Sequence, residues 1–209
     1  MNPSLISALA VAGGNWVIYG LILCSVAALA VILERWKVLS REEKLFAALQ
    51  SEVLARRKDA EGVRSALKVG GAAGRILGAA LDDASDNPEV FEDILISASL
   101  KEKKFLEKRL LVLGTLGNNA PFIGLFGTVL GVIKAFHDLA ANAAGPDAVM
   151  AGLSTALVAT AVGLFVAIPS VVAYNYFQKK ASDLLSGTES LGRLLLARLR
   201  RAPAARRAA

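Results

Sequence analysis

Three long stretches of this chain carry no charged side chain, and charge-rich segments separate them. The first stretch ends before Glu34, the second runs from Leu110 to Ile133, and the third runs from Ala148 to Gln178. A helix rises about 1.5 Å per residue, so each stretch is long enough to cross a hydrocarbon layer roughly 30 Å thick. The pattern therefore predicts an all-α membrane protein with three transmembrane helices.

The first stretch is predicted to be a retained span whose N-terminus lies outside. Charged residues arrive only from Glu34 onward, whereas a signal peptide carries positive charge before its apolar run. Trp16 and Trp36 are twenty residues apart, about 30 Å along a helix, which suits one aromatic ring at each membrane interface. We expect residues 1–35 to hold an outer N-terminal segment and transmembrane helix 1.

Residues 36–109 have the hydrophobic periodicity of amphipathic helices and are predicted to form a large cytoplasmic helical region. Gly70-Gly71 and Gly74 should interrupt the helices, and Arg75–Asp83 should form a short helix after them. The segment Asn87-Pro88-Glu89 is typical of a helix start, with a capping Asn, a Pro in the first turn and an acid at the positive end. We expect that helix to run into the second span without a loop.

The remaining boundaries follow from the same pattern. Transmembrane helix 2 is predicted over residues 110–136 and transmembrane helix 3 over residues 150–178, and both are expected to extend into the cytoplasm. A short periplasmic loop, residues 137–149 with a turn at Gly145-Pro146, should join them. Two prolines should kink these helices, because each removes a backbone donor: Pro121 and Pro169.

Small residues recur in both spans at the spacing that lets helix backbones approach closely. Asn118 and Asn119 interrupt the second span, and polar groups at that depth must face the bundle or a cavity, because lipid cannot bond them. The residues that we assign to helix packing are Gly117, Gly124, Gly127, Gly131, Gly152, Ala156 and Gly163.

Charge distribution sets the expected orientation. The net charge is +6, but residues 35–109 are nearly balanced, with fifteen Lys and Arg against thirteen Asp and Glu. Residues 179–207 hold eight basic residues against two acidic ones, so the excess lies in a basic cytoplasmic tail, residues 179–209. Basic residues beside spans are topology signals before they are binding surfaces, so nucleic acid is not predicted. The tail from Arg193 to Arg207 is expected to lie on anionic membrane lipids or, alternatively, to meet a cytosolic protein.

Candidate chemistry is sparse. Cys24 is the only cysteine and His137 the only histidine, so the sequence predicts no disulfide framework, no metal site and no cofactor. No phosphate-binding loop, catalytic motif or paired carboxylates occur, and an enzyme needs ionisable groups in a pocket. We therefore expect no catalytic residues and no enzyme activity. The inverted repeats of a small-molecule transporter are not visible either.

Two stretches carry a family resemblance. The sequences APFIGLFGTVLGVIKAF at 120–136 and ALVATAVGLFVAIPSVVAYNYF at 156–177 resemble the second and third spans of the TolQ/ExbB/MotA proton-channel family, closest to its TolQ/ExbB branch. The order of one span, a large cytoplasmic region and two further spans is similar as well. The resemblance therefore covers almost the whole chain.

The resemblance implies a ring-forming subunit of a motor in the bacterial inner membrane. In such complexes five copies surround two copies of a single-span partner similar to TolR or ExbD, and the membrane aspartate of that partner takes up and releases protons. The proton motive force would then drive work in the envelope, as TonB-type uptake, Tol-type envelope maintenance or gliding motility. A membrane scaffold of the same fold that conducts no ions is the alternative.

The resemblance also implies the residues of the ion path. Thr128 and Thr160 correspond to the pore-facing threonines of the family, and a hydroxyl can bond a carboxylate in either protonation state. The alternative for each is a packing residue that bonds its own helix carbonyl. Thr155 stands where TolQ and ExbB carry a glutamate, so the third span has no ionisable group of that kind and sodium use stays open. We expect Thr128, Thr155 and Thr160 to line one surface around the partner's aspartate.

Overall fold

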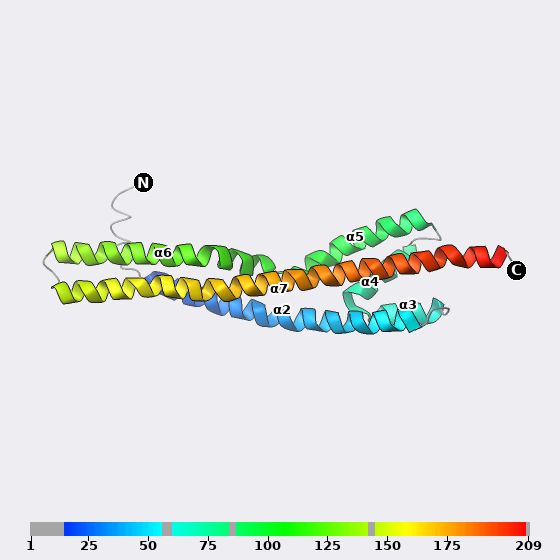
Figure 1. Ribbon diagram of the computed structural model, residues 1–209, viewed down its shortest axis with the longest axis horizontal. Coiled ribbons are helices and arrows are strands. Elements are labelled where there is room, and N and C mark those ends of the chain that lie inside the picture. Colours follow the sequence, from blue (N-terminus) through cyan, green and yellow to red (C-terminus); the bar gives the residue numbers. More distant parts are fainter. Residues whose placement is uncertain (1–14, 56–59, 84–86, 142–144, 208–209) are drawn as a thin grey trace. The chain divides into compact units, whose positions relative to one another are not determined.

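Every regular element in the computed structural model is an α-helix within the residues it describes, which are 15–55, 60–83, 87–141 and 145–207 (Figure 1). The helices are α2 (Asn15–Ala55), α3 (Ala60–Val69), α4 (Gly71–Asp83), α5 (Pro88–Leu106), α6 (Leu110–Ala140) and α7 (Pro146–Arg207). Three of them, α2, α6 and α7, are long and apolar enough to cross a membrane. The predicted all-α fold with three candidate spans is confirmed for this part of the chain; the outer N-terminal segment before residue 15 lies outside it.

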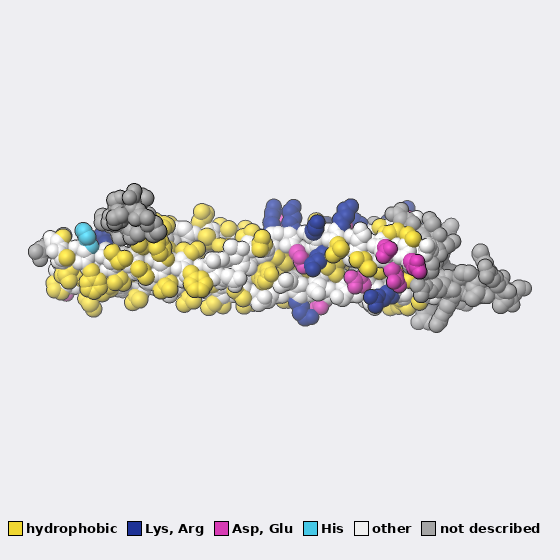
Figure 2. Space-filling view, turned by 90° about the horizontal axis from the view of Figure 1, so that it is seen from above, with side chains coloured by type: hydrophobic (Ala, Val, Ile, Leu, Met, Phe, Trp, Pro, Cys, Tyr) yellow, Lys and Arg dark blue, Asp and Glu magenta, His cyan; other side chains and the backbone are white. Residues whose placement is uncertain are grey.

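The chain divides into two compact units. The first comprises Met1–Leu33 and Arg109–Asn175, and the second comprises Glu34–Lys108 and Tyr176–Ala209. Hydrophobic side chains dominate the surface of the first unit in Figure 2, whereas Lys, Arg, Asp and Glu side chains gather over the second. The difference matches a lipid-facing unit and a water-facing unit, because apolar surface is stable in lipid and charged surface is not.

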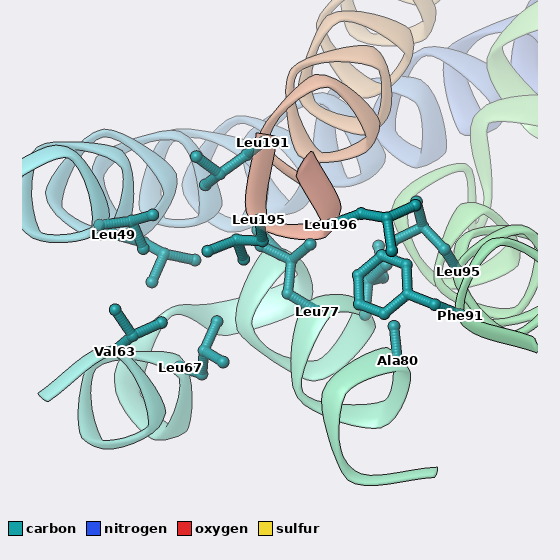
Figure 3. Close-up of a cluster of buried hydrophobic side chains, with 13 residues drawn as sticks. Leu49, Val63, Leu67, Leu77, Ala80, Phe91, Leu95, Leu191, Leu195 and Leu196 are labelled. Carbon is teal, nitrogen blue, oxygen red and sulfur yellow. The ribbon is translucent and has the colours of Figure 1, made fainter. Parts of the chain in front are cut away.

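The second unit has a hydrophobic core to which five helices contribute (Figure 3). Helix α7 continues through the first part of residues 179–209, which the sequence assigns to the basic tail, and places leucines in this core. Arg198 also donates from Nη1 to the carbonyl oxygen of Val53, 3.0 Å away, near the end of α2. Side chains beyond Arg198 lie outside the described residues. The core residues are Leu49, Val53, Val63, Leu67, Ala73, Ile76, Leu77, Ala80, Phe91, Leu95, Leu191, Leu195 and Leu196.

The glycine-rich break falls where α3 gives way to α4. Gly71 has a φ of 63°, a left-handed conformation that glycine adopts without strain, and the Ala72 amide donates to Oε2 of Glu42 at 2.7 Å. Gly74 does not interrupt a helix as predicted, because α4 already begins at Gly71. Its role is packing instead: a Cβ at Gly74 would collide with the backbone carbonyl of Leu67.

The predicted start of α5 is confirmed. Asn87 caps the helix with its side-chain oxygen, which accepts from the Glu89 amide at 3.0 Å, and Pro88 occupies the first turn. The ion pair between Arg75 and Glu102 then joins α4 to α5, with Arg75 Nη2 2.7 Å from the carboxylate. This hydrogen bond raises the pKa of Arg75 above its usual value.

The expectation that α5 runs into α6 without a loop is wrong. Helix α5 ends at Leu106, and Arg109 immediately before α6 has a left-handed φ of 64°. Arg35 is buried in the second unit and donates to the Phe105 carbonyl at 3.4 Å and to Glu34 at 2.7 Å. The Phe105 carbonyl also accepts from the Lys108 amide at 3.3 Å, and a cation at a helix C-terminus is favoured by the negative end of the helix dipole. Arg35 follows the first span directly, where basic residues are topology signals, and it packs inside the second unit.

The connection between α6 and α7 is shorter than predicted. Helix α6 continues to Ala140, and α7 already begins at Pro146. The predicted turn at Gly145-Pro146 is a helix start, because the Gly145 carbonyl accepts from the amides of Ala148 and Val149 at 3.1 and 3.2 Å. Proline suits the first helical position, where its missing amide costs no hydrogen bond. The location of the membrane boundaries along these helices stays a prediction.

The left-handed residue between α5 and α6 gives a first test. Arg109→Gly should raise the midpoint of thermal unfolding in mild detergent by roughly 2–4 °C relative to Arg109→Ala, because glycine removes about 1 kcal/mol of backbone strain. Alanine is the matched control, since it removes the same side chain and keeps Cβ. An alanine variant as stable as the glycine variant would show that the conformation at residue 109 carries no strain.

Candidate functional site

In the first unit α6 and α7 lie side by side and antiparallel, and they approach closely where small residues face each other (Figure 1). A Cβ at Gly124 would lie 2.7 Å from the carbonyl oxygen of Ala159, and a Cβ at Gly163 would lie 2.6 Å from that of Ala120. Both obstacles are backbone atoms of the facing helix, which cannot rotate away. The two positions therefore require glycine.

The seam of small residues continues on both sides of this crossing. A Cβ at Gly117 would lie 2.5 Å from Cγ2 of Val171, and one at Gly131 would lie 2.5 Å from Cβ of Ala156. These four residues keep the two backbones close over several turns. In lipid, where burial of apolar surface gives no net driving force, such contacts hold helices together.

Two further glycines assigned to packing behave differently. A Cβ at Gly127 would meet Cβ of Ala159 at 2.8 Å and Cγ1 of Val17 at 3.0 Å, so this glycine makes room for α2 as well as α7. A Cβ at Gly152 would lie 3.4 Å from Cβ of Ala135, an ordinary contact distance. Gly152 therefore lies in the seam without being required there. The role of Val17 carried no signal in the sequence, because it is one apolar residue among many.

Two of the three predicted threonines meet across the seam. Thr160 Oγ1 donates to Thr128 Oγ1 over 3.5 Å, and Thr128 Oγ1 donates to the Leu125 carbonyl at 2.7 Å. Thr128 is only 9% exposed, whereas Thr160 is half-buried. A distance of 3.5 Å is at the outer limit of a hydrogen bond, so the Thr160 hydroxyl is held weakly. The Thr128 hydroxyl is therefore held firmly by the Leu125 carbonyl, whereas the Thr160 hydroxyl can turn to another acceptor.

Thr155 is not part of this pair. Its Oγ1 donates to the Ala151 carbonyl at 3.0 Å, one turn back in its own helix, and the residue is exposed. Five residues separate Thr155 from Thr160, which places it about 140° around the helix and roughly 7.5 Å along it. Within one chain the three threonines therefore do not share the single surface that the sequence led us to expect. A common surface would need contributions from more than one chain.

The asparagines of α6 do not face the bundle within this chain. Asn118 and Asn119 are both exposed, and the Asn119 amide nitrogen donates to the Thr115 carbonyl at 2.8 Å. Nine residues, or about 180° of helix, separate Asn119 from Thr128. The sequence predicts that these asparagines face either the helix bundle or a cavity. Their exposure excludes the interior of the bundle formed by the described residues of this chain, so a cavity outside that bundle is the alternative that is left.

The prolines and one serine complete the site. Pro121 and Pro169 lie inside the continuous helices α6 and α7, and the kink expected at each stays a prediction. Ser170 follows Pro169 directly, is fully buried, and donates to the Val166 carbonyl at 2.7 Å. In the sequence, this serine is marked only as a hydroxyl in an apolar run.

The chemistry available here is that of neutral groups. No acidic or basic side chain occurs from Leu110 to Ile133 or from Ala148 to Gln178. Among the described residues, no group of three or more His, Cys, Asp or Glu side chains is placed to hold a metal ion. Hydroxyls and amides can bond water or a carboxylate from another molecule, but they cannot carry a proton's charge themselves.

The crossing of α6 and α7 yields a stability test. Gly124→Ala and Gly163→Ala should each lower the free energy of unfolding by about 1–3 kcal/mol, because the new methyl group meets a backbone carbonyl. Gly20→Ala on α2 is the control, since no atom lies within 4 Å of a Cβ placed there. The measurement is thermal unfolding in detergent. Equal stability of all three variants would contradict the close crossing.

The amino-acid sequence of this chain is similar to those of known proteins. A family model described as MotA/TolQ/ExbB proton channel family matches residues 41–190. Biopolymer transport protein ExbB of Helicobacter pylori is 51% identical over 83 residues, which are 39% of this chain and 56% of that protein. Tol-Pal system protein TolQ of Pseudomonas aeruginosa is 44% identical over 86 residues, 41% of this chain and 37% of that protein. Biopolymer transport protein ExbB of Aquifex aeolicus is 41% identical over 90 residues, 43% of this chain and 61% of that protein.

The extent of these matches decides what they show. The chain spans about half the length of the curated relatives that it matches. The family model, however, covers well over half of the 209 residues and includes the seam with Thr128 and Thr160. The chain therefore belongs to the MotA/TolQ/ExbB proton channel family.

Proposed function

We propose that this chain is the ring-forming subunit of a bacterial inner-membrane motor that couples an ion gradient, in the first place of protons, to work in the cell envelope. Relatives named for biopolymer transport and for the Tol-Pal system support this reading. Five copies of the chain surround two copies of a single-span protein similar to TolR or ExbD. The work done is TonB-type uptake, Tol-type envelope maintenance or gliding motility.

One observation carries the proposal: the contact of Thr128 and Thr160 between two charge-free helices. The Thr128 proton is committed to the Leu125 carbonyl, so Thr128 offers only lone pairs to Thr160. The Thr160 hydroxyl is held over 3.5 Å and can turn to bond a carboxylate or a water. Thr128 thus positions Thr160, and Thr160 contacts the partner's membrane aspartate in both of its protonation states.

The titrating group belongs to the partner in this scheme. Thr155 stands at the position where TolQ and ExbB carry a glutamate, and it is exposed with its hydroxyl bonded to its own helix. Each ion that crosses would therefore be bound and released by the partner's aspartate alone. Thr155 of a neighbouring copy can contribute to the same ion path, because it lies on a different flank of α7 from Thr160.

The orientation follows from charge. Basic residues flank the proposed inner ends of the spans, and the charge-covered second unit belongs in the cytoplasm by the positive-inside rule (Figure 2). The N-terminus and the connection between α6 and α7 then lie on the periplasmic side. Ions would move from that connection towards the second unit.

The test replaces Thr160 by two residues of similar size. Thr160→Val keeps the shape and removes the hydroxyl, whereas Thr160→Ser keeps the hydroxyl. Proton flux into proteoliposomes that hold the chain with its single-span partner should fall roughly tenfold or more in the Val variant, and the Ser variant should retain most of it. Native mass spectrometry of each complex is the control for unchanged assembly. Full flux through an assembled Val variant would refute the role of the hydroxyl.

A second candidate is a membrane scaffold of the same fold that conducts no ions. The observation in its favour is the lack of any acidic side chain in the span from Ala148 to Gln178. The two functions differ in their response to an uncoupler, which stops a motor's work and leaves a scaffold's localisation intact. Purification in gentle detergent provides the other distinction: a complex that retains two copies of a partner with a membrane aspartate is a motor, and a ring that never retains one is a scaffold.

A further inference from the structure

A cluster of polar side chains on α6, which we call the amide belt, consists of Thr115, Asn118 and Asn119. All three residues are exposed, so neither α2 nor α7 of the same chain covers them. Asn119 uses its amide nitrogen on the Thr115 carbonyl, 2.8 Å away, and keeps its side-chain oxygen as an acceptor. The belt therefore presents hydrogen-bonding groups outward from a helix that has no charged residue from Leu110 to Ile133.

Contact with lipid would destabilise the polar side chains of the amide belt. Hydrocarbon offers no hydrogen bond, and an amide left without one costs roughly 1–3 kcal/mol or more. The outward face of α2 is the contrast, because its strongly exposed residues are apolar: Leu23, Val26 and Leu29 are 71%, 62% and 57% exposed. On α6 the belt interrupts a surface that is apolar on either side of it, where Leu111 and Phe122 are 79% and 69% exposed.

Helix α7 offers the belt no hydrogen-bonding partner at the level of the belt either. The close pairs Gly117–Val171 and Gly124–Gly163 define the antiparallel register, which places residues 169–173 of α7 at the level of the belt. The only hydrogen-bonding side chain in that stretch is Ser170, which is fully buried and bonded to the Val166 carbonyl. Water is the occupant that satisfies the belt without a matching side chain.

We propose that the amide belt lines a water-filled exit through which ions leave the spans towards the cytoplasm. The belt lies five to nine residues past Leu110, about 8–14 Å from the start of α6. Polar groups continue to that end: the Tyr174 ring packs 3.2 Å from the position of a Cβ on Gly114, and Asn175 is exposed. The direction of flow rests on the proposed function, whereas the exposure of the belt does not.

The chemistry of the belt suits passage of a hydrated cation. Carboxamide and hydroxyl oxygens accept hydrogen bonds from hydronium or from the water around a metal cation. They carry no charge, so they bind such a species weakly enough for it to leave, as conduction requires. A carboxylate at the same place would hold the cation more tightly.

The experiment measures water access by cysteine labelling in inside-out membrane vesicles that hold the complete complex. Asn118→Cys and, as an independent second variant, Asn119→Cys are made in a Cys24→Ala background, and Leu29→Cys on the apolar face of α2 is the control. The probe is a positively charged methanethiosulfonate that does not cross membranes. We expect both belt cysteines to react at least tenfold faster than Leu29→Cys. Rates equal to that control would overturn the proposal, whether lipid or a second copy covers the belt.

Two marker variants separate this proposal from the proposed function. Lys37→Cys and Asp147→Cys report the side on which each end of the spans lies. Belt cysteines that react together with Lys37→Cys support the exit, and belt cysteines that react only together with Asp147→Cys overturn it. Reactive belt cysteines in a complex that carries no proton flux would support the water-filled belt and count against the motor.

Discussion

The close approach of α6 and α7 at Gly124 and Gly163 is the constraint on which the membrane unit depends. Lipid supplies no hydrophobic driving force between helices, so their association rests on packing at short range. Because backbone carbonyls occupy the space where a Cβ would stand, this crossing sets the register of the two helices. The meeting of Thr128 with Thr160, one turn along α6 from Gly124, is a consequence of that register.

The same packing gives the unit two unlike sides. Gly127 makes room for Val17, which seats α2 against α6 and leaves the apolar outer face of α2 uncovered. The far side of α6 carries exposed amides between exposed apolar residues. A subunit with one side suited to lipid and another suited to water or protein can stand in a ring, since lipid surrounds a ring only on its outside.

Neutral groups supply all the polarity within the spans. Thr128 and Thr160 between the helices, Thr155 on another flank and the amide belt can bond ions in transit, yet none of them can hold a proton's charge. In the proposed motor, the charge-carrying step therefore belongs to the ionisable side chain of the partner. This division would let a chain with a charge-free third span contribute to the proposed ion path.

Properties that depend on neighbouring residues could be predicted from the amino-acid sequence: three charge-free stretches, the helix start at Asn87, and two motifs that indicate the family. Tertiary structure decided what depends on residues far apart in the chain. It joins Thr128 to Thr160 across 32 positions while leaving Thr155 on another face, and it draws the leucines after residue 179 into the core of the second unit. It also brings Arg35 to the end of α5, where the guanidinium donates to the carbonyl of Phe105, seventy positions later in the chain. Local patterns carry helix length and polarity, but the facing of two helices is set by packing between side chains that the pattern of one helix does not contain.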